Sequence, residues 1–216
     1  MSDTIFRYHY RGHLNSDNTD NLEEAIEAAR QNIASLMREE RVMTACVYRY
    51  ENMIFAYYET IGKELEPEEL FSPLSSCLAK WPGEKNERTW VNMYHVFYHA
   101  IPEGKEDWKR ARKPELQRGR IAFLKPEKLF SYVYHHVAIT EEGLLHGDKY
   151  QSIALHENIL FSYFEEPRTD INIKRDLSQE SKVIEDWIRV IPEDHFIQGP
   201  EHTNFTFISA LIAMGQ

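Results

Sequence analysis

The chain has 216 residues, of which 42% are hydrophobic and 12% aromatic, which is enough to bury one large core or two small ones. Its formal net charge of -10 at pH 7 argues against nucleic acid as a partner, because affinity for a phosphate backbone comes mainly from clustered Lys and Arg. No apolar run of about 18 residues and no signal-peptide pattern occurs, so we expect a cytoplasmic protein without a membrane partner. Cys46 and Cys77 lack Cys-x-x-Cys spacing, which favours reduced, buried thiols.

The first predicted element is an aromatic-rich strand over residues 4–12, in which successive side chains point to opposite faces. One face carries Phe6, Tyr8 and Tyr10. The other face is polar and carries Arg7, His9 and Arg11. The polar face has two interpretations. It lines an interior cleft, with His9 as a candidate catalytic residue and the two arginines as ligand-binding residues, or it is a solvated face near a sheet edge.

A helix is predicted next over residues 21–40, where apolar residues recur at intervals of three and four. Two β-rich runs follow, and the Glu51-Asn52 pair between them suits a tight hairpin. A second helix starts at Glu66-Pro67, where a proline costs no hydrogen bond, and a fourth strand covers residues 90–100. The order βαββαβ predicts a ferredoxin-like unit, an antiparallel sheet with both helices on one face.

A repeat links the two halves of the chain. Residues 50–59 (YENMIFAYYE) return as residues 156–165 (HENILFSYFE), with five of the ten positions identical. Residues 5–10 are matched with residues 129–134, although 46 residues separate Phe6 from Asn52 and only 28 separate Phe130 from Asn158. The second copy is therefore predicted to lack its first helix. Its expected elements are strands over residues 129–139, 149–156, 159–165 and 203–213, with a helix over residues 178–189.

These elements predict an α+β fold of two tandem ferredoxin-like units, residues 1–101 and 129–216, whose sheets pack face to face as a pseudo-dimeric α/β barrel. One chain then suffices for the barrel, so a monomer is expected, with further oligomerisation left open. Residues 102–128 form the predicted linker and carry nine Lys or Arg against five Asp or Glu, including an Arg118-Gly119-Arg120 step. This linker either clasps an anionic ligand or is a solvated crossing that pairs with acidic neighbours.

The segment expected in place of the missing helix, residues 139–149, contains Gly143 and Gly147 together with His146, Asp148 and Lys149. A loop with these side chains suits closure over a ligand, in the gap that a lost helix would leave. His146 is then a candidate catalytic residue, and Asp148 and Lys149 are candidate ligand-binding residues. In the alternative interpretation the loop only fills the gap, and its glycines make turns.

Histidines on the predicted strands supply further candidates. His95 and His99 share a face of the fourth strand, but a rise of about 3.3 Å per residue places them about 13 Å apart, too far for one metal ion. His135 and His136 point to opposite faces, so no metal site is assigned. The remaining candidates are His95 and His156 as catalytic residues and His99, His135 and Glu157 as ligand-binding residues.

Residues 155–165 (LHENILFSYFE) resemble the central hairpin of the L-rhamnose mutarotases, and residues 52–59 are similar to the same element. The resemblance implies a dimeric α/β-barrel fold, in which ferredoxin-like sheets pair and small molecules bind within the barrel or between sheet and helices. In that family the catalytic His and its neighbouring Tyr lie on the first helix. Residues 21–40 contain neither residue type, so the resemblance implies the fold more than the chemistry.

Two classes of function follow. The first is an enzyme acting on a small molecule, such as a sugar or polar-metabolite isomerase using His, whose ordinary pKa of about 6.5 permits proton transfer at neutral pH. The second is a non-catalytic protein that binds a ligand or partner. A haem-binding or cofactor-free oxygenase, also known in this superfamily, is a further alternative in which a His is the axial ligand. No cofactor is assigned.

Overall fold

The structure is a computed structural model that describes residues 4–15, 21–82, 87–170, 173–175, 177–199 and 202–215. The chain divides into two compact units. Unit 1 comprises Met1–Met93, Pro102–Pro114 and Ser209–Gln216, and unit 2 comprises Tyr94–Ile101 and Glu115–Ile208. No helix among the described residues is both long and apolar enough to cross a membrane.

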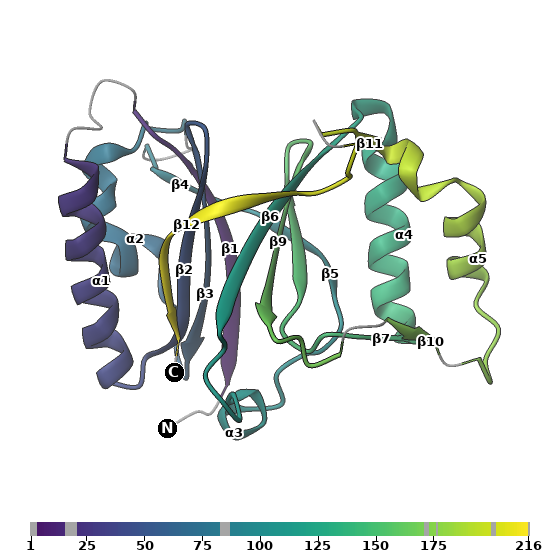
Figure 1. Cartoon of the computed structure of the whole chain (residues 1–216), viewed down its shortest axis with the longest axis horizontal. Coiled ribbons are helices and arrows are strands. Elements are labelled where there is room, and N and C mark those ends of the chain that lie inside the picture. Colours follow the sequence, from purple (N-terminus) through teal and green to yellow (C-terminus); the bar gives the residue numbers. More distant parts are fainter. Residues whose placement is uncertain are drawn as a thin grey trace. The chain divides into compact units, whose positions relative to one another are not determined.

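The sheet of unit 1 has the antiparallel order β4-β1-β3-β2, followed by the second part of β12 (Thr206–Gly215). Its other strands are β1 (Ile5–His13), β2 (Val42–Tyr50), β3 (Met53–Ile61) and β4 (Trp90–Asn92). The helices α1 (Leu22–Arg38) and α2 (Pro67–Phe71) lie on one face of this sheet, as Figure 1 shows. The short helix α3 (Lys105–Trp108) also belongs to unit 1. The strands and the first helix predicted for residues 4–61 are confirmed, the second helix begins where predicted, and the strand order is that of a βαββαβ unit.

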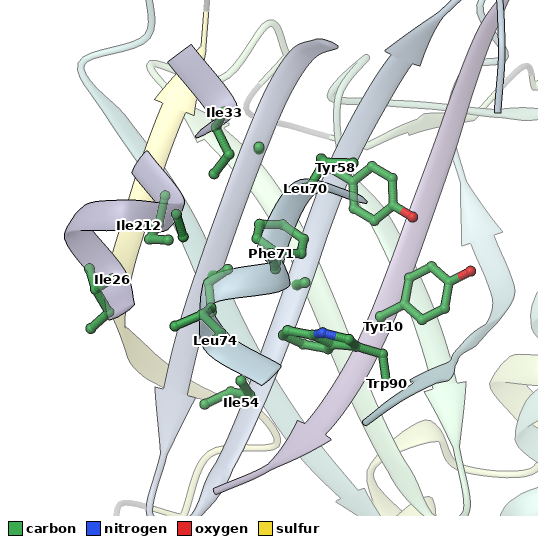
Figure 2. Packing of buried hydrophobic residues seen from close by; sticks show 14 of the residues in the cluster. Tyr10, Ile26, Ile33, Ile54, Tyr58, Leu70, Phe71, Leu74, Trp90 and Ile212 are labelled. Atoms are coloured by element: carbon green, nitrogen blue, oxygen red, sulfur yellow. The ribbon is translucent and has the colours of Figure 1, made fainter. Parts of the chain in front are cut away.

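Helical periodicity places the core of unit 1 between α1, α2 and the sheet (Figure 2). Ile33 of α1 is 0% exposed and shares this core with Ile212 of β12. The second helix begins as expected, because Pro67 occupies its first turn and Glu66 and Glu69 form a capping box. It continues past Phe71 only as the 3-10 helix Ser72–Cys77, since Pro73 has no N–H to donate to a further α-helical turn.

The sheet of unit 2 has the antiparallel order β6-β9-β8-β5, and the first part of β12, residues 206–208, pairs with β6. Its strands are β5 (Tyr94–Tyr98), β6 (Leu116–Leu124), β8 (Ser152–His156) and β9 (Ile159–Glu166), while β11 (Phe196–Ile197) pairs with β6. A separate pair joins β7 (Leu145–His146) to β10 (Lys174–Arg175). The main helices are α4 (Leu129–Glu142) and α5 (Lys182–Arg189), with the 3-10 helices Pro126–Lys128 and Pro192–His195.

The second copy keeps its first helix, which corrects the prediction from sequence. Residues 129–139 form α4 rather than a strand, and the predicted linker contains the first strand, β6. The two hairpins prove the correct alignment, because the backbone N–H of Leu14 donates to Asn52 O (2.7 Å) and that of Leu124 donates to Asn158 O (2.8 Å). Leu14 therefore corresponds to Leu124. No segment as long as a helix has been lost between the first strand and the hairpin.

The physical reason for this difference lies in α4 itself. Its aromatic residues favour a strand locally, but Tyr132, His135 and Ile139 recur at helical spacing and are all buried. The helix ends at Gly143, whose φ of 69° is the left-handed conformation that glycine adopts freely. Burial of one helical face outweighs the local strand preference.

The fourth strand of each copy contributes to both units. Residues 90–92 form β4 in unit 1, whereas residues 94–98 form β5 and pair with β8 in unit 2. In the second copy, residues 206–208 of β12 pair with β6 in unit 2, and residues 209–215 pair with β2 in unit 1. The predicted strands over residues 90–100 and 203–213 are each divided in this way, so the predicted domain limits do not match the compact units.

Candidate functional site

A cavity of about 270 Å³ lies in unit 2 beside the end of β5. Its lining comes from residues 97–101, from the last turn of α4, and from the turn and short strand β7 that follow α4. Two candidates from the sequence, His99 and His146, line this cavity together. The segment 139–149 contributes to the lining, although residues 139–142 are the last turn of α4 and the remainder follows this helix rather than replacing one.

A β-bulge places His99 on the face of the sheet that packs against α4. In the pairing of β5 with β8, His95 lies opposite Ala154 and Phe97 lies opposite Ile153, so β5 has one extra residue between the two pairs. This extra residue moves the following side chains to the other face. The prediction that His95 and His99 share a face is therefore wrong. His99 instead lies beside Phe97, with ring centroids 4.8 Å apart.

The imidazole of His99 is a partly buried polar group in the cavity wall. Both ring nitrogens are buried, and neither makes a well-formed hydrogen bond to the described residues; a weaker one to the backbone of Leu145 favours the charged form. Burial lowers the pKa of His99 below its ordinary value, and the neighbouring His146 lowers it further. The backbone of Leu145 and the charge of Asp148 act in the opposite direction and raise this pKa. His99 is therefore mainly neutral at pH 7 and offers one N–H donor and one nitrogen acceptor.

Gly147 packs directly against this imidazole. A Cβ at Gly147 would lie 2.6 Å from both Cε1 and Nε2 of His99, so only glycine fits without moving the ring. Gly143 differs, because its surroundings are open and its left-handed φ makes it the C-cap of α4. The two glycines therefore have different structural roles: Gly143 ends α4, and Gly147 leaves room for the imidazole of His99.

Asp148 anchors the segment that follows β7. It is 2% exposed, and its Oδ1 accepts hydrogen bonds from the backbone N–H (3.2 Å) and the hydroxyl (2.7 Å) of Thr169. The same hydroxyl accepts a 2.7 Å hydrogen bond from the backbone N–H of Lys149. Within the described part of the chain, Oδ2 of Asp148 is buried with no hydrogen-bond partner. Its charge favours the protonated form of His99.

In unit 1, Arg7, His9 and Arg11 share one face of β1, opposite the face that α1 and α2 cover. His9 is 0% exposed, and its ring lies edge-on to that of Tyr57 at 4.9 Å. Arg11 is 6% exposed, with its guanidinium 5.4 Å from the ring centroid of Trp81. These side chains are packed, so the interpretation of a solvated face is wrong. None of them lines the cavity of unit 2.

A buried ion pair that the sequence did not reveal lies on the same face of unit 1. Glu59 accepts hydrogen bonds from the guanidinium of Arg110 (2.5 and 2.9 Å), from the indole of Trp108 (2.8 Å) and from the hydroxyl of Tyr57 (2.5 Å). Burial alone raises the pKa of Glu59. The charge and hydrogen bonds of Arg110, together with the charge of Arg7, outweigh this effect and lower the pKa to about 2. Removing one partner from such a pair costs about 3–5 kcal/mol, so we assign this cluster a structural role.

The remaining candidates lie elsewhere. His135 is on α4, 7% exposed, with Nδ1 2.7 Å from the carbonyl oxygen of Ser131. His156 ends β8, and Glu157 is exposed with φ 55° in the turn to β9. With His95, none of these residues lines the cavity.

Within the described ranges, no three His, Cys, Asp or Glu side chains are grouped so that they could hold a metal ion. Cys46 and Cys77 form no disulfide and both are buried thiols, as predicted. Thr140, Phe97 and the packing role of Gly147 were missed at the site. The sequence gives no indication that Gly147 packs on His99, because the two residues are far apart along the chain.

No protein-family model and no curated protein matches the chain. Among solved structures, a putative monooxygenase from Fusobacterium nucleatum subsp. nucleatum ATCC 25586 is similar, with 12% identity, a TM-score of 0.43, and 100% of this chain and 96% of that chain covered. A putative monooxygenase from Lactobacillus acidophilus NCFM has 6% identity and a TM-score of 0.42, covering 99% and 97%. A mutant chlorite dismutase from Candidatus Nitrospira defluvii has 10% identity and a TM-score of 0.33, covering 98% and 93%. Similarity at this level carries no argument about activity, and the resemblance to L-rhamnose mutarotases stays a prediction.

Proposed function

We propose that the chain binds a small polar molecule in the cavity of unit 2 and that His99 is the main hydrogen-bonding group of this site. The observation that supports it is the imidazole in the cavity wall, whose buried ring nitrogens make no well-formed hydrogen bond to the described residues. A buried polar group left without a partner costs about 1–3 kcal/mol. A ligand that exchanges a hydrogen bond with His99 removes this cost on binding.

The size and lining of the cavity favour a compact ligand. Its volume of about 270 Å³ lies below the roughly 300–1,000 Å³ of drug-sized sites, so a molecule of about monosaccharide size is the upper limit. Phe97 and Ile139 supply apolar surface, while Thr140, His99 and His146 supply polar groups. This combination suits a sugar or a similar polar metabolite, which has both hydroxyl groups and an apolar ring face.

The chemistry that best fits these residues is acid–base isomerisation of the bound molecule, as in the opening of a sugar ring. Neutral His99 accepts the proton of the anomeric hydroxyl, and the ring oxygen gains a proton from solvent or from His146, which is exposed. Asp148 stabilises the imidazolium that forms on His99. Reversal of these transfers closes the ring on either face, so no oxidant or cofactor takes part.

The test is anomer exchange measured by NMR on L-rhamnose, D-glucose and D-ribose with the full chain. We expect exchange faster than in buffer for at least one sugar, reduced by about 10²-fold or more in His99→Gln, as for loss of a general base. His13→Gln, a partly buried histidine of unit 1, is the control and should retain the wild-type rate. Equal exchange in wild type and His99→Gln would exclude His99 as the base.

Binding without turnover is the second candidate function, and the same samples distinguish it. A sugar that shifts the imidazole resonances of His99 without accelerating exchange supports a non-catalytic binding protein. Failure of every sugar to move these resonances would contradict the assignment of this class of ligand to the cavity. A Soret band in the absorbance spectrum of the purified protein would instead support the haem alternative.

A further inference from the structure

The two copies differ in charge on the helix-covered face of their sheets. In unit 1 this face carries Tyr8 and Tyr10, both stacked on Tyr58 with ring centroids 5.0 and 5.9 Å apart. The strand registers place Arg118 and Arg120 of β6 at the positions equivalent to Tyr8 and Tyr10. A tyrosine cluster in one copy has therefore become a cationic position in the other.

Arg120 lies among aromatic rings rather than carboxylates. Its guanidinium carbon is 4.5 Å from the ring centroid of Phe205 and 5.2 Å from that of Phe164, and its Nε donates to the hydroxyl of Ser162 at 3.4 Å. The guanidinium of Arg168 lies 4.3 Å from the centroid of the same Phe164 ring. Two guanidinium groups thus share one buried aromatic side chain.

Neither arginine forms an ion pair within the part of the chain that the structure describes. Arg118, on the same strand, does pair with a carboxylate, since its Nε lies 3.3 Å from Oε2 of Glu166. Burial and the nearby charge of Arg168 lower the pKa of Arg120 to about 10, so the pair is held together at an electrostatic cost. In a chain with a net charge of -10, these two neighbouring cations pair with no carboxylate of the described residues.

We propose that Arg120 and Arg168 form a binding site for an organic anion on the helix-covered face of unit 2. The oxyanion of a carboxylate or phosphate accepts hydrogen bonds from both guanidinium groups, which match such groups in a bidentate manner. The apolar part of the ligand packs on Phe205 and on Phe207 of β12, a residue that is 59% exposed and lies opposite Arg120 of β6. This site shares no residue with the cavity at His99 and does not depend on the proposed function.

The test uses the full chain and follows the Nε–Hε signals of Arg120 and Arg168 by NMR during titration with benzoate, phenyl phosphate or benzamide. Saturable shifts of both signals with at least one anion, and none with the neutral benzamide, are expected. Benzoate and phenyl phosphate distinguish the two kinds of oxyanion. Absence of shifts with both anions, or equal shifts with benzamide, would overturn the proposal.

Variants separate this site from general charge attraction. Arg120→Gln and Arg168→Gln should each weaken anion binding by at least about tenfold, the effect of losing a charge-assisted hydrogen bond. Arg189→Gln is the matched control, because Arg189 lies on the exposed surface of the same unit and pairs with Asp186. Arg120→Tyr introduces the residue of the other copy and tests the site if the glutamine variant does not fold. Equal weakening by Arg189→Gln would show non-specific attraction and contradict the proposal.

Discussion

At the scale of single residues, the contact between Gly147 and His99 links backbone packing to the candidate site. Gly147→Ala is expected to displace the imidazole, because its Cβ would lie 2.6 Å from two ring atoms. The backbone of Gly147 is not in the left-handed region, so the substitution acts through this contact alone. We predict that ligand binding falls at least as much as in His99→Gln, at a stability cost of about 1–3 kcal/mol.

The readouts are ligand titration and urea unfolding. Gly143→Ala is the matched control, because it adds the same methyl group into open space but at φ 69°. It should destabilise α4 by about 1–2 kcal/mol; because Gly143 itself lines the cavity, it is the control for stability and not for ligand affinity. Normal binding by Gly147→Ala would mean that the position of the His99 ring is not important for the site.

At the scale of elements, α4 packs against α5 through an aromatic and imidazole cluster. His136 stacks on Tyr132 with ring centroids 3.8 Å apart and meets Trp187 edge-on at 4.8 Å. Burial lowers the pKa of His136 to about 4 and that of His195, beside it in the cluster, also below its ordinary value. Both histidines are therefore neutral when the protein is folded at neutral pH.

This cluster predicts acid sensitivity over a defined range of pH. The unfolded state binds more protons than the folded state between pH 6.5 and about 4, so the free energy of unfolding falls as the pH is lowered through this range. For His136 the loss amounts to about 3 kcal/mol at most. His136→Phe, which keeps an aromatic ring on Tyr132, should lose less stability between pH 7 and pH 4.5 in urea unfolding. A wild-type loss identical to that of the variant would show that His136 does not titrate in this way.

At the scale of the whole molecule, each compact unit is built from segments that are distant in the sequence. The C-terminal residues 209–215 pair with β2, and Ile212 is 0% exposed in the core of unit 1 (Figure 2). Trp108 and Arg110 reach the buried Glu59 of unit 1 from a segment that follows β5. Unit 1 therefore depends on residues beyond the predicted limit of 101.

Two measurements check this dependence. Ile212→Ala should lower the free energy of unfolding by about 2–5 kcal/mol, as for other large-to-small changes in a core. Ala210→Ser, at an exposed position of the same strand, should change it by no more than about 0.5 kcal/mol. A fragment of residues 1–101 is expected to lack a cooperative unfolding transition in circular dichroism, because Glu59 loses its ion-pair partner. Cooperative folding of this fragment would show that the later segments are dispensable.

The second copy shows how far local patterns can be trusted. The repeated hairpin is recognisable from the sequence because a turn and its flanking strands are short-range features, and the same holds for the helical periodicity of α1. Residues 129–134 resemble the aromatic residues 5–10 more closely than β6 does, so local sequence alone misplaces the first strand and helix of the second copy. Only the hydrogen bonds of Leu14 and Leu124 to equivalent hairpin positions corrected the alignment.

The sequence by itself determined that the chain is an acidic α+β protein with an internal repeat, since composition and periodicity depend on the residues alone. It also pointed to His99 and His146 as candidates. The tertiary structure decided which histidines share a cavity. One extra residue in β5 moves every side chain after it, including that of His99, to the opposite face of the sheet. The tertiary structure also decided that Arg110 pairs with Glu59 and that Arg120 and Arg168 contact the same Phe164 ring. These residues are far apart in the sequence, so their spacing along the chain does not predict the contacts.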